Sequence, residues 1–126
     1  MKRDMDLIRK ILFTIEAEYK AGEASIWGVK IDDYDMPTIA EHCDLLYQQG
    51  LIKSYKQARA DDKIYAFQVG NLTNLGYDYL ELIRNDNVWE KTKAEIEEKQ
   101  RPKTIEEIAR VAGIFVGNVF KEFTDR

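Results

Sequence analysis

The sequence contains few residues of the types that build covalent cross-links or metal sites. It has a single cysteine, Cys43, and a single histidine, His42. A lone cysteine excludes an intramolecular disulfide and every zinc site that depends on cysteine pairs. Adjacent residues on a helix point about 100° apart, so His42 and Cys43 do not form a dyad or a chelate. We expect His42 to be a structural residue at the helix–core boundary and Cys43 to be a small buried hydrophobic residue.

Long apolar runs and catalytic motifs are also missing. No apolar stretch is long enough to span a bilayer, and residues 1–7 carry charge without the apolar segment of a signal peptide. The sequence has no glycine-rich phosphate loop, zinc-ligand spacing or nucleophile elbow. No pair of acidic residues stands out for acid–base chemistry. We therefore expect a cytoplasmic protein that is not an enzyme and has no metal site and no cofactor.

The composition is that of a folded domain with an acidic balance. The chain has 126 residues, of which 44% are hydrophobic and 33% charged, which is enough apolar residue for one core. The 19 basic and 23 acidic residues give a formal net charge of −4. A free-standing nucleic-acid-binding protein is usually basic, so the total counts against DNA as a partner. It does not exclude DNA, because the local field at a contact surface matters more than the total.

The N-terminal part of the chain predicts a helix followed by an extended arm. Apolar residues recur every three or four positions across residues 4–20, which indicates one amphipathic helix. Asp4 or Asp6 can accept hydrogen bonds from its free amides, and Gly22 is placed to end it. Residues 24–34 lack the helical period and predict a short strand or an extended arm. There we expect Trp27 to be a hydrophobic plug rather than a base-stacking group.

A second short helix is predicted to follow this arm. Asp35 is a good N-cap, Pro37 is tolerated in the first turn, and Gly50 ends the helix in the left-handed conformation. One face should pack into the core and the other should point outward. The core face comprises Ile39, His42, Cys43 and Leu46, and the outward face comprises Ala40, Glu41, Asp44, Tyr47 and Gln48.

Two alternating runs after Gly50 predict a β-hairpin. Residues 53–57 and 63–69 form the strands, and residues 58–62 form the turn between them. Arg59 and Lys63 lie near the tip of this hairpin. They either hold phosphate or guard an exposed strand edge with charge, and both roles stay open.

The C-terminal part of the chain predicts three further helices. The first opens at Thr73 as its N-cap, the second spans residues 88–99, and the third opens with the capping box Thr104–Glu107. Residues that should pack inward from the first of them are Tyr77, Tyr79, Leu80 and Ile83.

The apolar face of the last helix is too wide for a helix that faces solvent. It must cover the core, pair with a second copy or bind another protein. The residues proposed for such an interface are Ile108, Phe115, Val119 and Phe123. We expect one domain over residues 1–86 and a helical extension over residues 87–126 that either pairs with a second copy or covers the core.

Two short segments resemble those of small bacterial winged-helix repressors. Glu41–Ile52 is similar to their recognition helix and the strand after it, and Leu72-Thr-Asn-Leu-Gly76 resembles the start of their next helix. The whole chain resembles more specifically the domain-of-unknown-function 2513 family of small bacterial and prophage-encoded proteins. Residues 1–12, 42–52 and 83–93 carry that resemblance. It implies a winged-helix-like fold and no established activity.

The sequence thus predicts a mainly α fold with a small β-hairpin, an α+β winged helix-turn-helix-like domain. The leading hypothesis is a protein that binds double-stranded DNA as a dimer, with the helix over residues 36–49 in the major groove. The DNA-binding residues would be Thr38, Glu41, Tyr47, Gln48, Gln49, Arg59 and Lys63. Glu41 and Asp44 depart from the basic and hydroxyl residues usual on such helices and would repel phosphate. The alternative is a protein–protein interaction module that kept the winged fold and lost nucleic acid.

Overall fold

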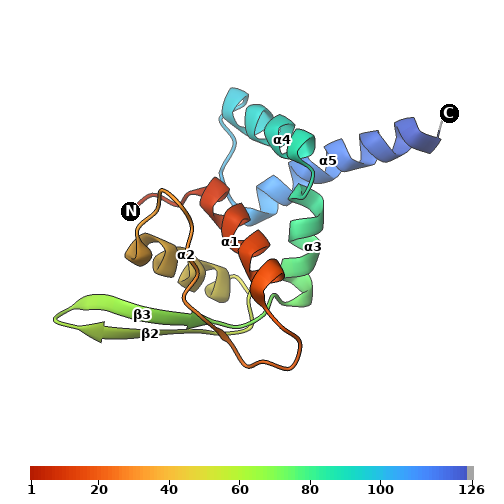
Figure 1. Ribbon diagram of the computed structural model, residues 1–126. Helices are drawn as coiled ribbons and strands as arrows, with labels where there is room; N and C mark the ends of the chain where they lie inside the picture. The colour runs from red at the N-terminus through yellow and green to blue at the C-terminus, as the bar shows by residue number, and fades with distance from the viewer. Residues whose placement is uncertain (125–126) are drawn as a thin grey trace. The chain divides into compact units, whose positions relative to one another are not determined.

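The computed structural model describes residues 1–124, with side chains described for residues 1–117 (Figure 1). Over that range the chain forms five helices and one small antiparallel sheet, which confirms the predicted mainly α, α+β class. The elements in order are α1 (Met5–Glu18), β1 (Ile26–Trp27), α2 (Met36–Gln48), β2 (Tyr55–Ala60), β3 (Lys63–Val69), α3 (Asn74–Ile83), α4 (Asp86–Glu98) and α5 (Ile105–Thr124). No helix within residues 1–124 combines the length and the apolar content needed to cross a bilayer.

The chain divides into two compact units. The first comprises Met1–Tyr77, and the second begins at Asp78, so the boundary falls within α3. The first unit contains the sheet together with α1 and α2, and the second contains α4 and α5. The domain boundary expected at residues 86/87 stays a prediction, because a compact unit is not by itself an independently folding domain.

Side-chain caps fix the starts of the helices as the sequence predicts. The Asp4 carboxylate accepts from the Leu7 amide at 3.1 Å, and the Asp35 carboxylate accepts from the Thr38 amide at 2.8 Å. Both caps satisfy amides that have no partner inside their own helix. At the other end of α2, Gly50 adopts a φ of +80°, which ends the helix where expected.

The core of the first unit lies between α1, α2 and one face of the sheet. Six buried residues form the stripe of α1, namely Met5, Leu7, Ile8, Ile11, Leu12 and Ile15. The predicted core face of α2 is confirmed, since Ile39, His42, Cys43 and Leu46 are all buried. Phe67 and Val69 of β3 are buried as well.

Three burial predictions are wrong. Ala40 is fully buried rather than outward, because the apolar face of α2 is wider than one stripe. Trp27 is 72% exposed rather than a plug, because the short strand β1 turns it away from the core. Tyr77 is exposed, and its hydroxyl donates to Asn71 Oδ1 at 3.1 Å instead of packing inward.

The sheet has the strand order β1-β3-β2, and both pairings are antiparallel. The predicted turn over residues 58–62 is too long, because β2 continues to Ala60 and only Asp61 and Asp62 connect the strands. These two residues have φ of +54° and +64°. Left-handed conformations at both central positions define the tight hairpin turn whose twist matches that of the strands, and aspartate tolerates them better than most residues.

The segment between α1 and α2 does not have the form of a helix-turn-helix. Residues 19–35 connect the two helices, and they include β1 and the left-handed residues Gly22, Gly28 and Asp33. A helix-turn-helix joins its helices by three or four residues. Within the described chain, α2 is the helix that immediately precedes the hairpin, but it lacks the short turn to a preceding helix.

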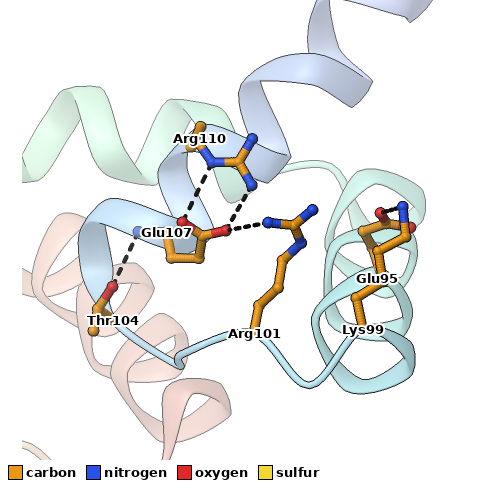
Figure 2. Close-up of polar contacts among 6 residues, drawn as sticks. All are labelled: Glu95, Lys99, Arg101, Thr104, Glu107 and Arg110. Atoms are coloured by element: carbon orange, nitrogen blue, oxygen red, sulfur yellow. Dashed lines mark hydrogen bonds and ion pairs between the residues drawn. The ribbon is translucent and has the colours of Figure 1, made fainter.

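In the second unit, α4 and α5 pack against each other, and Trp89, Ile96, Ile108 and Val111 of these helices are buried. Figure 2 shows the polar contacts around the connection between these helices. The Thr104 hydroxyl caps α5 by accepting from the Glu107 amide at 3.1 Å, which confirms one half of the predicted capping box. The Glu107 carboxylate turns instead to Arg101 at 3.2 Å and Arg110 at 2.6 Å.

Candidate nucleic-acid interface

Thr73 joins the end of α2 to the start of α3 and so holds the base of the hairpin. Its hydroxyl donates to the Gly50 carbonyl at 2.6 Å and accepts from the Gly76 amide at 3.0 Å. The Thr73 amide donates to the Leu51 carbonyl at 3.0 Å. A Cβ added at Gly76 would overlap the Leu51 carbonyl oxygen, so this position requires glycine. The Leu-Thr-x-x-Gly pattern therefore encodes a close backbone crossing.

The predicted DNA-binding residues of α2 do not share one surface. Glu41 and Gln48 lie two turns apart on the outward face, and Thr38 and Gln49 lie at one edge of it, as follows from 100° per residue. Tyr47 is exposed but lies roughly 120° around the helix from Glu41. A single groove that accepted Glu41 and Gln48 would therefore leave Tyr47 to one side.

Arg59 does not lie free at the hairpin tip. The two-residue turn places it on β2, on the sheet face that it shares with the buried Phe67 and Ile64. From there it reaches α2, where Nη2 lies 3.8 Å from Glu41 Oε1, and Nη1 donates to the Asp62 carbonyl at 3.3 Å. Both charged groups are about half exposed, so the pair contributes at most about 1 kcal/mol to stability. Its clearer effect is to neutralise Glu41.

Tyr55 on β2 lies close to the acidic residues of α2. Burial first, and then the nearby carboxylates of Asp44 and Glu41, raise the pKa of Tyr55 to about 12, while Arg59 opposes that shift. The phenol of Tyr55 therefore stays protonated at neutral pH.

The opposite face of the sheet differs in charge from the face toward α2. Its residues follow from the strand pairing, because paired residues in antiparallel strands place their side chains on the same side. Trp27 pairs with Gln68, and Gln68 pairs with Lys56, so these three form one row across β1, β3 and β2. Further along the same face lie Ala58 with Ala66 and then Ala60 with Lys63. We call this surface the outer sheet face, and none of its seven residues is acidic.

Lys56 and Lys63 are the cations of the outer sheet face, and both are exposed. Neither forms an ion pair with any residue that the structure describes, in contrast to Arg59. Lys63 was expected as a phosphate contact, whereas Lys56 and Gln68 were not singled out. The alternation of apolar and polar residues in β2 and β3 indicated that these side chains face outward. Only the turn length and the strand pairing show that they lie on the same face.

The lone histidine belongs to a structural cluster at the start of α1. The buried His42 accepts from the Asp4 amide through Nε2 at 2.9 Å, and Nδ1 lies 2.8 Å from the Thr38 carbonyl. A donor is needed at Nδ1 and an acceptor at Nε2, so the neutral ring with its proton on Nδ1 satisfies both contacts. The Tyr34 hydroxyl completes the cluster by donating to Asp4 Oδ2 at 2.8 Å.

The hydrogen bonds of this cluster shift the pKa values of Asp4 and Tyr34. Burial alone would raise the pKa of Asp4, but donation from the Leu7 amide and the Tyr34 hydroxyl outweighs it, and the pKa is lowered. The same hydrogen bond raises the pKa of Tyr34 to about 12. His42, like Cys43, is thus a structural residue as the sequence predicts. Tyr34 and Asp4 could not be assigned as its partners from spacing.

Two other features do not form a defined chemical site. A cavity of about 400 Å³ opens beside α1, and its lining includes Lys10, Lys30, Asp32 and Asp33, so it carries mixed charge. Among the described residues, no three His, Cys, Asp or Glu side chains gather closely enough to hold a metal ion.

The residues proposed for a protein interface on α5 fall into three groups. Ile108 is 3% exposed and belongs to the core of its own unit, so its side chain is not free for a partner. Phe115 is half-buried, and its neighbour Ile114 is 51% exposed. Val119 and Phe123 have side chains outside the described residues. The interface itself stays a prediction.

Comparison with known proteins supports a family assignment. A family described as "Hypothetical protein (DUF2513)" matches residues 2–102. An "Uncharacterized protein" of Haemophilus influenzae (strain ATCC 51907 / DSM 11121 / KW20 / Rd) is 30% identical over 119 residues, which cover 94% of this chain and 98% of that protein. No solved structure is significantly similar to the chain. The chain therefore belongs to the domain-of-unknown-function 2513 family, as its sequence resemblance predicted.

Proposed function

We propose that this protein is a non-enzymatic winged-helix protein of prophage type that binds DNA and grips the phosphate backbone with its hairpin. One observation carries the proposal: the outer sheet face presents Lys56 and Lys63 without a neighbouring carboxylate on that face. Unpaired surface cations release condensed counterions when they meet phosphates, and this supplies sequence-independent affinity. The local charge of the outer sheet face thus favours DNA even though the whole chain carries −4.

The proposal assigns α2 a smaller role than the sequence suggested. Asp44 is not neutralised by any ion pair within the described residues, and Glu41 is neutralised only through Arg59. Gln48 is exposed on the same face and carries an amide of the kind that pairs with adenine. In this arrangement the hairpin supplies most of the affinity for DNA. Base recognition is assigned to the exposed side-chain amides of α2.

Fluorescence anisotropy with a labelled, mixed-sequence DNA duplex tests this proposal. The protein would be titrated at low salt and again at physiological salt. Replacing Lys56 and Lys63 with alanine should lower the slope of log affinity against log salt by about 2, since each phosphate contact contributes about 0.9. A matched variant with Lys20→Ala and Lys91→Ala, two exposed lysines that are not part of the sheet, should leave that slope unchanged.

The results separate the roles of the hairpin and of the whole protein. Equal slopes in both double variants would remove the outer sheet face from the proposal. Absence of duplex binding by the native protein even at low salt, where nonspecific attraction is strongest, would reject binding of double-stranded DNA.

A second candidate function is a protein–protein interaction module, and the exposed Ile114 beside the half-buried Phe115 on α5 favours it. Two neighbouring apolar side chains that their own unit does not bury fit a helix of a second copy. Analytical ultracentrifugation tests this candidate. A dimeric mass that becomes monomeric in an Ile114→Glu variant supports it, and a monomeric native protein at micromolar concentration contradicts self-association.

A further inference from the structure

The outer sheet face contains an aromatic side chain that the core does not explain. Trp27 is 72% exposed, whereas the other tryptophan, Trp89, is 2% exposed. Single exposed apolar residues are common on protein surfaces and carry no argument alone. Trp27, however, stands at one end of a row with Gln68 and Lys56, on a face without acidic side chains.

The row is ordered across three strands. Neighbouring strands lie about 4.8 Å apart, so the backbone positions of Trp27 and Lys56 are separated by about 10 Å. Gln68 stands between them, and its Oε1 accepts from Ser25 Oγ at 2.6 Å. That hydrogen bond fixes the amide with its NH₂ group available as a donor.

The paired residues of the next two rows are mostly small, and Tyr65, which the register skips beside them, is 64% exposed. Ala58 and Ala66 form the neighbouring row, and their methyl groups do not rise above the sheet. Ala60 and the exposed Lys63 follow beside the turn. The surface therefore offers an indole platform at one side, small residues in its middle, and a lysine on either side of those small residues.

We propose that the outer sheet face binds single-stranded nucleic acid, with Trp27 stacking on one base and Lys56 and Lys63 holding phosphates. Gln68 donates a hydrogen bond to the edge of the stacked base. An indole face stacks only on a base that is free of its own neighbours, so this geometry favours a single strand over an intact duplex. Positive charge along the face complements the backbone of the strand and does not complement an apolar partner. The inference rests on the proposed nucleic-acid binding and names the form of nucleic acid that this face takes.

The test uses the full chain and a labelled oligodeoxythymidylate of about 12 nucleotides, within the usual site sizes of such surfaces. Anisotropy titrations would compare the native protein with Trp27→Ala, Trp27→Phe and the control Leu75→Ala, which removes an exposed apolar side chain from α3. Trp27→Ala should weaken single-strand binding about 5- to 100-fold, as loss of one stacked base predicts. Trp27→Phe should retain part of the affinity, and Leu75→Ala should retain all of it.

A second measurement observes the indole directly. In a Trp89→Phe background, Trp27 is the remaining tryptophan, and stacking on a base should quench its emission during the titration. Circular dichroism confirms that this background is folded, and the anisotropy experiment does not depend on it.

The outcomes distinguish this inference from the proposed function. Loss of single-strand binding in Trp27→Ala with duplex binding unchanged supports the inference. Single-strand binding that is equal in native protein and Trp27→Ala overturns it, while any duplex binding keeps the proposed function intact. Failure of the native protein to bind either duplex or single strand at low salt rejects both.

Discussion

The close crossing of Gly76 and Leu51 makes the substitution Gly76→Ala a sharp test of the fold. A Cβ at position 76 would overlap the Leu51 carbonyl oxygen and lie 3.1 Å from its carbonyl carbon. This oxygen cannot move away without cost, because it accepts the hydrogen bond from the Thr73 amide. Overpacking of this kind costs about 1–3 kcal/mol. The usual gain of alanine over glycine within a helix offsets at most about 1 kcal/mol.

The overlap is severe, so we take the upper end of this cost, about 3 kcal/mol, and expect Gly76→Ala to lower the free energy of unfolding by about 2 kcal/mol after the offset. For a unit of this size, each kcal/mol corresponds to a decrease in Tm of about 4–8 °C. Urea denaturation followed by circular dichroism measures the free energy, and a thermal scan of the same samples measures Tm.

A matched control is available in α5. A Cβ added at Gly113 meets no atom within 4 Å, so Gly113→Ala should stabilise the helix by about 0.5–1 kcal/mol. The same chemical change thus has opposite expected signs at the two positions. If Gly76→Ala were as stable as the native protein, or if both variants gained stability, the close contact between Gly76 and the Leu51 carbonyl would be wrong.

The remaining predictions concern three ionisable groups in the first unit. The pKa of Asp4 is lower in the folded state than its unfolded value of 3.8. Its contribution to stability is therefore complete above pH 3.8 and is lost as the pH falls through the folded-state pKa. Asp4→Asn should flatten the acid limb of stability against pH. The pKa of Tyr34 is raised to about 12, so its contribution to stability is present below pH 10 and is lost as the pH rises toward 12. Tyr34→Phe should flatten the alkaline limb of stability against pH and cost about 1 kcal/mol at neutral pH. Unchanged acid and alkaline limbs would contradict the hydrogen bond between Tyr34 and Asp4. Burial raises the pKa of Cys43 to about 12, so a thiol reagent at pH 8 should modify it only as fast as the protein unfolds, and immediate modification of the native protein would contradict its burial.

Local patterns in the sequence predicted the helices well because their causes are local. Asp4 and Asp35 are capping residues, Gly50 ends α2 with a positive φ, and the stripe of α1 follows the helical period. The same holds for Thr73 and Thr104, whose hydroxyls accept from amides three residues ahead. Each of these features depends on residues within one or two turns.

The candidate site was harder to predict because it depends on strand pairing. Asp61 and Asp62 make a two-residue turn where a five-residue turn was expected, and this moves Arg59 from the tip onto β2, facing α2. A register irregularity between Ala58 and Arg59 adds to the difference. A shift of one residue exchanges the two faces of a strand, so periodicity alone could not say which lysines share a surface. The exposure of Trp27 follows from its pairing with Gln68, which is distant in sequence.

The contacts of Thr73 have a consequence for how this protein tolerates changes of length. Because one hydroxyl links Gly50 to Gly76, the two ends of the intervening segment are fixed beside each other, whatever lies between them. Extra strand residues added in pairs at Asp61–Asp62 would lengthen the hairpin without altering its base. Loop closure would oppose such an insertion by only about 0.6 kcal/mol for each doubling of the segment. The base of the hairpin is thus fixed while the length of its strands can change, so the hairpin can be adapted to a binding partner without altering the core.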